Sequence, residues 1–149
     1  GATAYMQNHP WLKKTGFFLN LEGVSGGSHV GKPILFRTSN VQTASLFKKI
    51  VGNKGLAFGN SIFQYGFLSR WLSSETDYKV YEKELIGWDI SFFKNRRFYH
   101  TLFDSTKYDT KYGVFTMLQV CSLLVKGMAM NEDLIDQDNL QNKAVYFDF

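Results

Sequence analysis

The run Phe17-Phe18-Leu19-Asn20-Leu21 is short and almost entirely apolar, and it lies between Gly16 and Gly23. A strand that other elements cover on both faces has this pattern, because neither set of its alternating side chains meets water. Such strands belong to sheets that are packed between layers of helices. The run therefore predicts a buried strand of an α/β fold, and the flanking sequence tests this prediction.

Two more strands are predicted downstream of this run. Residues 32–37 form an apolar segment whose early Pro33 suits the first residues of a strand. Residues 87–93 alternate between apolar and polar side chains in the manner of a strand. Residues 94–97 then turn the chain toward Tyr99-His100-Thr101.

Helical signals separate the predicted strands. Residues 1–14 have a short helical pattern, and Asn40 can cap a helix over about residues 41–51. We interpret residues 52–74 as irregular structure with short elements, and residues 78–84 as one or two helical turns. Apolar strands that alternate with helices predict a layered α/β architecture.

The strongest helical pattern follows Asp109 and Thr110, either of which can cap it. We expect this helix to be well buried, although no apolar run reaches the roughly 18 residues of a membrane span. Its apolar residues repeat at steps of four and three: Val114, Leu118, Cys121, Val125 and Met128, with Met117, Val120 and Leu124 widening the face. Residues 131–149 then turn acidic, so we divide the chain into a domain over residues 1–130 and a linker with a tail over residues 131–149.

Composition excludes several classes of protein. Of the 149 residues 44% are hydrophobic and 17% are aromatic, which describes a folded globular chain and not a disordered one. The single cysteine, Cys121, excludes an intrachain disulfide and is best explained as a small buried residue.

The net charge of +4 raises the possibility of an acidic partner. The one basic cluster, Lys94 with Arg96 and Arg97, lies among aromatic residues, as it would in a site for single-stranded nucleic acid. A buried strand that runs into a solvated turn produces the same pattern. We favour the strand and expect no nucleic-acid partner.

The three histidines differ in their settings. His9 lies beside Pro10 and His29 lies in a loop of glycine and serine, so both are most simply surface residues. His100 follows a predicted strand, where α/β proteins place functional side chains. An isolated histidine is nevertheless more often structural than a ligand or a catalytic group.

Two carboxylates also deserve comparison with simpler explanations. Glu22 ends the first apolar strand and precedes a glycine-rich loop, so it is a candidate metal ligand or a solvated residue beside a turn. Asp77 lies among polar and aromatic residues, where it could act in a site, or where it or Ser74 could cap a helix. The residues alone do not show that these groups converge.

Taken together, five stretches of the chain resemble the vacuolar membrane proteases of fungi. These proteins are related to metallopeptidases of the endoplasmic reticulum and to secreted di-zinc aminopeptidases. The matching stretches are Phe18-Leu19-Asn20-Leu21-Glu22-Gly23, residues 33–39, residues 73–81, Gly87-Trp88-Asp89-Ile90-Ser91-Phe92-Phe93 and Tyr99-His100-Thr101.

The resemblance implies a three-layer α/β/α sandwich of the zinc-exopeptidase type with a mixed central sheet, of which residues 1–130 form the C-terminal half. It implies that Glu22 binds one zinc ion and His100 the other, and that Tyr99 stabilises the transition state. Asp77 matches a position that supports the ligands or contacts the substrate. Imidazole and carboxylate suit zinc, and a phenol can donate to an oxyanion.

In the resembling family the other metal ligands and the general base precede a Gly-Ala pair that matches Gly1-Ala2. The resemblance thus implies an upstream half of the domain as partner, a peptide substrate and no activity of this chain alone. It also implies membrane spans outside this chain, beyond an acidic linker over residues 131–149, in a vacuolar membrane protein whose domain faces the lumen. Residues 28–31 are a short insertion relative to the family.

One other class of function remains open. The chain could be a noncatalytic binding or scaffold domain that retains half of the peptidase fold. A nucleic-acid binder is a more distant alternative, and it requires an affinity that depends on salt.

Overall fold

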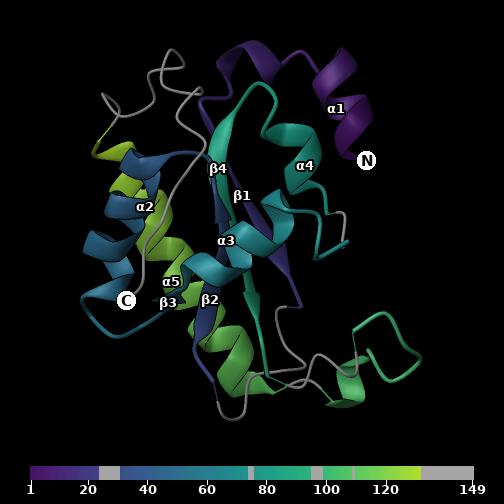
Figure 1. Ribbon diagram of the computed structural model, residues 1–149, viewed down its shortest axis with the longest axis vertical. Helices are drawn as coiled ribbons and strands as arrows, with labels where there is room; N and C mark the ends of the chain where they lie inside the picture. Colours follow the sequence, from purple (N-terminus) through teal and green to yellow (C-terminus); the bar gives the residue numbers. More distant parts are fainter. Residues whose placement is uncertain (24–30, 74–75, 95–98, 109, 132–149) are drawn as a thin grey trace.

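The structure is a computed structural model that describes residues 1–23, 31–73, 76–94, 99–108 and 110–131. Within these residues a four-stranded mixed sheet has the order β1-β4-β2-β3, with helices on both of its faces (Figure 1). β4 pairs parallel with β1 and antiparallel with β2, and β2 pairs parallel with β3. The strands are β1 (Phe17–Glu22), β2 (Pro33–Thr38), β3 (Phe58–Gly59) and β4 (Ile86–Phe92). The predicted α/β class is confirmed.

β4 is the buried centre of the sheet, and β1 is not. All residues of β4 are buried, whereas in β1 only Phe18 is fully buried and Leu21 is exposed. The prediction that β1 is covered on both faces is therefore wrong. The reason is position, because β1 lies at one edge of the described sheet and has β4 as its only neighbour there.

The first helical layer consists of α2 (Val41–Phe47), its π-helical continuation η3 (Lys48–Gly52) and α5 (Lys111–Ala129). Asn40 caps α2 as predicted, since its side chain accepts from the Thr43 amide while the Thr43 side chain accepts from the Asn40 amide. Alternate side chains of β4 point into this layer, and the Trp88 indole donates to the Thr43 carbonyl over 2.9 Å. The main core lies between this layer and the sheet.

α5 is present and is capped by Thr110 as predicted, but only part of its predicted apolar face is buried. The residues that pack on the sheet are Gly113, Met117, Val120, Leu124 and Met128. Val114, Leu118 and Val125 are exposed instead, so the prediction of a well-buried helix with these residues in its core face is wrong. The apolar pattern runs nearly all the way round the helix, and such a pattern does not reveal which side meets the sheet.

α5 is also long and apolar enough to cross a membrane, which differs from the sequence expectation. The helix of a soluble core passes the same test of length and composition. In this chain α5 packs one side against the sheet core through Met117, Val120 and Leu124. The finding is therefore weak evidence for a membrane span.

The second helical layer covers the opposite face of the sheet. It contains α1 (Ala2–Asn8), α3 (Ser61–Leu68) and α4 (Tyr78–Tyr81), and Figure 1 shows α1 and α4 across the sheet from α2. Phe18 packs here with Tyr78 and Leu85, whereas its neighbour Phe17 packs against the main core. Single-turn segments η1 (Leu12–Lys14) and η5 (Thr106–Tyr108) complete the described elements. α3 falls within residues 52–74, which the sequence analysis treats as largely irregular.

Candidate active site

Glu22 is the last residue of β1 and is half-buried. The Tyr99 hydroxyl donates to its carboxylate oxygen Oε2 over 2.6 Å. Gly23 follows with a φ of +53°, a backbone conformation that glycine adopts at little cost. The chain therefore turns sharply after β1 and leaves the Glu22 carboxylate at the end of the strand, beside Tyr99.

Tyr99 and His100 form a stacked pair. Their ring centroids are 4.0 Å apart with an interplanar angle of 17°. His100 is exposed and has a φ of +61°, which costs a residue with a Cβ roughly 1–2 kcal/mol. Strained backbone of this kind is concentrated at functional sites.

The structure thus connects three of the four predicted site residues through Tyr99, which bonds to Glu22 and stacks on His100. Glu22 ends β1, and Ser91, its partner in the parallel strand β4, is the next-to-last residue of that strand. The carboxyl ends of parallel strands are where α/β proteins place their ligands. This arrangement can position a carboxylate, a phenol and an imidazole at one edge of the sheet.

The fourth predicted residue, Asp77, is placed differently. It precedes α4, is exposed and makes no side-chain capping bond to that helix. The capping role considered for Asp77 is therefore wrong, and Ser74 lies outside the described residues. The Thr76 hydroxyl accepts from the Tyr78 amide over 3.3 Å instead.

A polar network that the sequence analysis missed lies beneath Glu22. The Asn20 side-chain amide donates to Asp89 Oδ1 over 2.7 Å and to Thr76 Oγ1 over 3.3 Å, and it lies 3.5 Å from Glu22 Oε1. Asn20 therefore joins the end of β1 to the centre of β4. Its position one residue before Leu21 in an apolar run is the signal that could have revealed it, since a polar side chain in a buried strand needs a partner.

Arg37 and Asp89 form a buried ion pair at the base of this network. The Arg37 Nη2 lies 2.7 Å from Asp89 Oδ2, and Arg37 Nε donates to the same oxygen over 2.8 Å. Burial raises the pKa of Asp89, while the Arg37 guanidinium and the Asn20 amide act in the opposite direction. Arg37 also donates to the Thr76 hydroxyl. The ion pair joins β2 to β4, and Asn20 connects its Asp89 to Glu22.

The remaining sequence candidates lie outside this site. His9 is exposed and stacks on Tyr5 with centroids 4.5 Å apart, whereas His29 falls outside the described residues. Arg96 and Arg97 of the basic cluster are also outside them. Cys121 is half-buried, and burial raises the pKa of its thiol.

The donors at this site suit zinc in type. Carboxylate oxygen and imidazole nitrogen are common zinc ligands, and Glu22 has one carboxylate oxygen already oriented by Tyr99. Among the described residues, no group of three or more His, Cys, Asp or Glu side chains gathers to hold a metal ion. A zinc site normally takes at least three protein ligands, so the residues here fit as part of a donor set.

The chain matches the family described as Peptidase family M28 over residues 1–125. It is 48% identical to the vacuolar membrane protease of Candida glabrata, 45% identical to that of Lachancea thermotolerans and 44% identical to that of Saccharomyces cerevisiae strain YJM789. These matches cover 99–100% of the chain but only 14–15% of each relative. No solved structure matches the chain.

Proposed function

Because this chain belongs to peptidase family M28, we propose that it supplies part of the active site of a zinc-dependent, aminopeptidase-like enzyme. The observation that carries the proposal is the 2.6 Å hydrogen bond from Tyr99 to Glu22, with His100 stacked on the same tyrosine. Three side chains that suit peptide hydrolysis gather there from segments far apart in the sequence. Names of the relatives support a protease of the vacuolar membrane, and we propose that this domain faces the lumen.

In this proposal Glu22 and His100 each bind one of two zinc ions. When bound, zinc lowers the pKa of a coordinated water and so supplies the nucleophile at neutral pH. Glu22 is held for this task by Tyr99 on one oxygen and approached by Asn20 on the other. The exposure of His100 leaves its imidazole accessible to a metal and to the upstream part of the domain.

Tyr99 has a donor role in this mechanism. Its hydroxyl donates to Glu22 in the structure, so its proton points toward the carboxylate end of the site. In the reaction we propose that the same proton stabilises the oxyanion that forms when water attacks the peptide carbonyl. Asp77 contacts the substrate or supports the ligands from the start of α4.

The partner in this proposal is the upstream half of the domain, which contributes the remaining ligands and the general base. The exposed edge of β1, with Leu21 39% exposed, is where we propose that the sheet continues. The isolated chain is then inactive and binds zinc weakly, because a carboxylate and an imidazole supply too few donors for a tight site. Membrane attachment comes from spans outside this chain, and we propose no nucleic-acid partner.

The test is peptide hydrolysis by the full-length protein that carries this segment. We expect chelator-sensitive cleavage of fluorogenic aminoacyl substrates, its loss in His100→Ala, and its retention in His9→Ala. His9 is a matched control, since it is an exposed histidine stacked on a tyrosine in α1. Wild-type turnover in His100→Ala would refute the ligand role. Absence of any hydrolysis in the wild type would favour the noncatalytic binding or scaffold domain.

A further inference from the structure

A cavity of about 480 Å³ lies beside α3 and α4, on the face of the sheet opposite α5. Three of its lining residues are basic, namely Arg37, Arg70 and Lys79, and one is acidic, Glu82. A cavity with this charge content is suited to an anionic group. The two arginines differ in how they are held: the Arg37 side chain has fixed partners, whereas the backbone of Arg70 is held in a defined turn.

Arg37 is held rigidly at the cavity wall. Its Nε and Nη2 atoms bond to Asp89, and its guanidinium lies 4.2 Å from the Phe67 ring centroid and 4.6 Å from that of Tyr78. Its remaining nitrogen, Nη1, makes no hydrogen bond within the described part of the chain. A guanidinium that is already ordered loses little conformational entropy when a ligand binds.

Arg70 occupies a backbone conformation that usually selects glycine. It follows the end of α3 with a φ of +60°, and Leu72 folds back so that its amide donates to the Gly66 carbonyl over 2.9 Å. A Cβ at Gly66 would lie 2.8 Å from Leu72, so this glycine permits the close approach. The turn is therefore well determined, and an arginine is kept at a strained position where its side chain lines the cavity.

The charged groups of the cavity lining sum to one excess positive charge once Asp89, the partner of Arg37, is counted. Asp89 offsets Arg37, which leaves two basic residues of the lining, Arg70 and Lys79, and one acidic residue, Glu82. A carboxylate is the anion that best matches a guanidinium, because its two oxygens accept two parallel N–H donors. The cavity thus has one excess positive charge, and Arg70 contributes to its lining a guanidinium whose shape matches a carboxylate.

A chain of hydrogen bonds links Arg37 of the cavity wall to Glu22 of the candidate active site. Arg37 bonds to Asp89, Asp89 accepts from Asn20, and Asn20 lies 3.5 Å from Glu22. We propose that this cavity binds a carboxylate group of the peptide substrate, an inference that rests on the proposed peptidase function. The carboxylate has two possible sources: an acidic side chain at the amino end of the substrate, or the free carboxyl terminus of a short peptide.

Kinetics of the full-length protein test this inference. We compare kcat/KM for a substrate with amino-terminal Glu against its Gln counterpart, and for a dipeptide against its carboxyl-terminal amide. The pair in which the acid is preferred identifies the source. We expect Arg70→Gln to lower the ratio of kcat/KM for the acid to kcat/KM for the amide about tenfold, as for loss of a charge-assisted bond at a partly solvated site. The value of kcat/KM for the amide substrate itself should change little.

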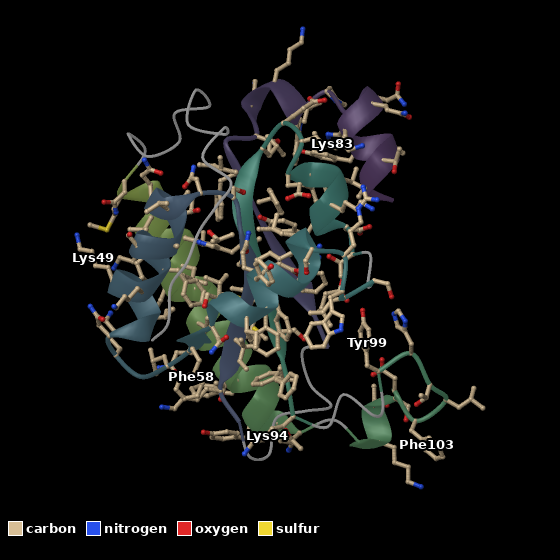
Figure 2. All side chains as sticks on the ribbon, in the orientation of Figure 1. Lys49, Phe58, Lys83, Lys94, Tyr99 and Phe103 are labelled. Atoms are coloured by element: carbon tan, nitrogen blue, oxygen red, sulfur yellow. The ribbon has the colours of Figure 1, made fainter. Side chains whose placement is uncertain are left out.

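Lys49→Gln is the control for this variant, because it removes one positive charge from an exposed residue of η3 (Figure 2) in the opposite helical layer. We expect it to leave the preference unchanged. Equal preference for acid and amide in both substrate pairs, or the same acid preference in Arg70→Gln as in the wild type, would overturn the inference.

Binding measured without turnover separates this inference from the proposed function. We expect calorimetric titration of the full-length protein to show glutarate binding more tightly than glutaramide, with an affinity about tenfold weaker in Arg70→Gln and unchanged in Lys49→Gln. If the protein hydrolyses no peptide but binds glutarate in a manner that depends on Arg70, the proposed peptidase function is refuted. The cavity is still a carboxylate site in that case. Equal affinity for glutarate and glutaramide would refute carboxylate binding in the cavity, even if the protein is an active peptidase.

Discussion

β1 and β4 are neighbouring parallel strands with similar apolar sequences, yet their environments differ. Every residue of β4 is buried between β1 and β2, whereas β1 is half-exposed and ends at Glu22. β4 contributes stability through its apolar side chains, and its Asp89 is the buried partner of Arg37. β1 contributes a candidate ligand at its end and, among the described strands, one edge that pairs with no other strand. The apolar sequence of a strand thus indicates what it is suited to pack against, and its neighbours decide whether it is covered.

The largest effect on stability is expected at Asp89 in β4. Asp89→Asn removes one charge of a buried pair and leaves Arg37 uncompensated, which typically costs about 3–5 kcal/mol. Urea denaturation of a soluble protein that contains this chain measures the change in the free energy of unfolding. The double variant Arg37→Met with Asp89→Leu is the control, because replacing both charges is often nearly neutral. A cost below about 1 kcal/mol for Asp89→Asn would show that the pair is not isolated from water.

A smaller effect is expected where β4 meets β1. Gly87→Ala places a Cβ 2.2 Å from the Phe18 carbonyl oxygen, so the two strands must move apart. Overpacking of this kind costs roughly 1–3 kcal/mol. Gly31→Ala is the matched control, since a Cβ there would lie 3.5 Å from Lys94, which is an ordinary contact. Equal unfolding midpoints for the two variants would contradict the close approach of β1 to β4.

The smallest effect on stability is expected on the exposed part of β1. Leu21 is 39% exposed, so Leu21→Lys changes the free energy of unfolding by only about 0.5 kcal/mol or less. A lysine on an edge strand discourages pairing with another chain. We therefore expect less self-association by light scattering and weaker binding of the upstream half that we propose as partner. If Leu21→Lys leaves both kinds of association unchanged and strongly lowers the free energy of unfolding, Leu21 packs within this chain. The edge of β1 is then not where the sheet continues.

The sequence predicted correctly those features that depend on neighbouring residues alone. Asn40 as a cap, Thr110 as a cap and the strand that contains Asp89 follow from local chemistry and are all present. The buried face of α5 was predicted too wide, because Val114 and Leu118 are as apolar as Met117 and Val120. Only the position of the sheet decides which of them is buried.

In the candidate site, too, some residues could be found from the sequence and others could not. Glu22 and His100 were candidates from their positions after strands, and the resemblance gave roles to them and to Tyr99. Their association through Tyr99 is a feature of the three-dimensional structure. Asn20 and Arg37 were missed, although a polar residue inside an apolar strand signals a buried partner. The identity of that partner depends on strand register, since Asn20 and Arg37 both pair with Asp89, and register was not predicted.

The central claim is that Glu22 and His100 are ligands to different metal ions of one site. Zinc content of the full-length protein after dialysis tests it most directly, with Glu22→Ala and His100→Ala measured beside the wild type. We predict about two zinc ions per wild-type chain and a reduced content in each variant. A wild-type zinc content in both variants would contradict the claim.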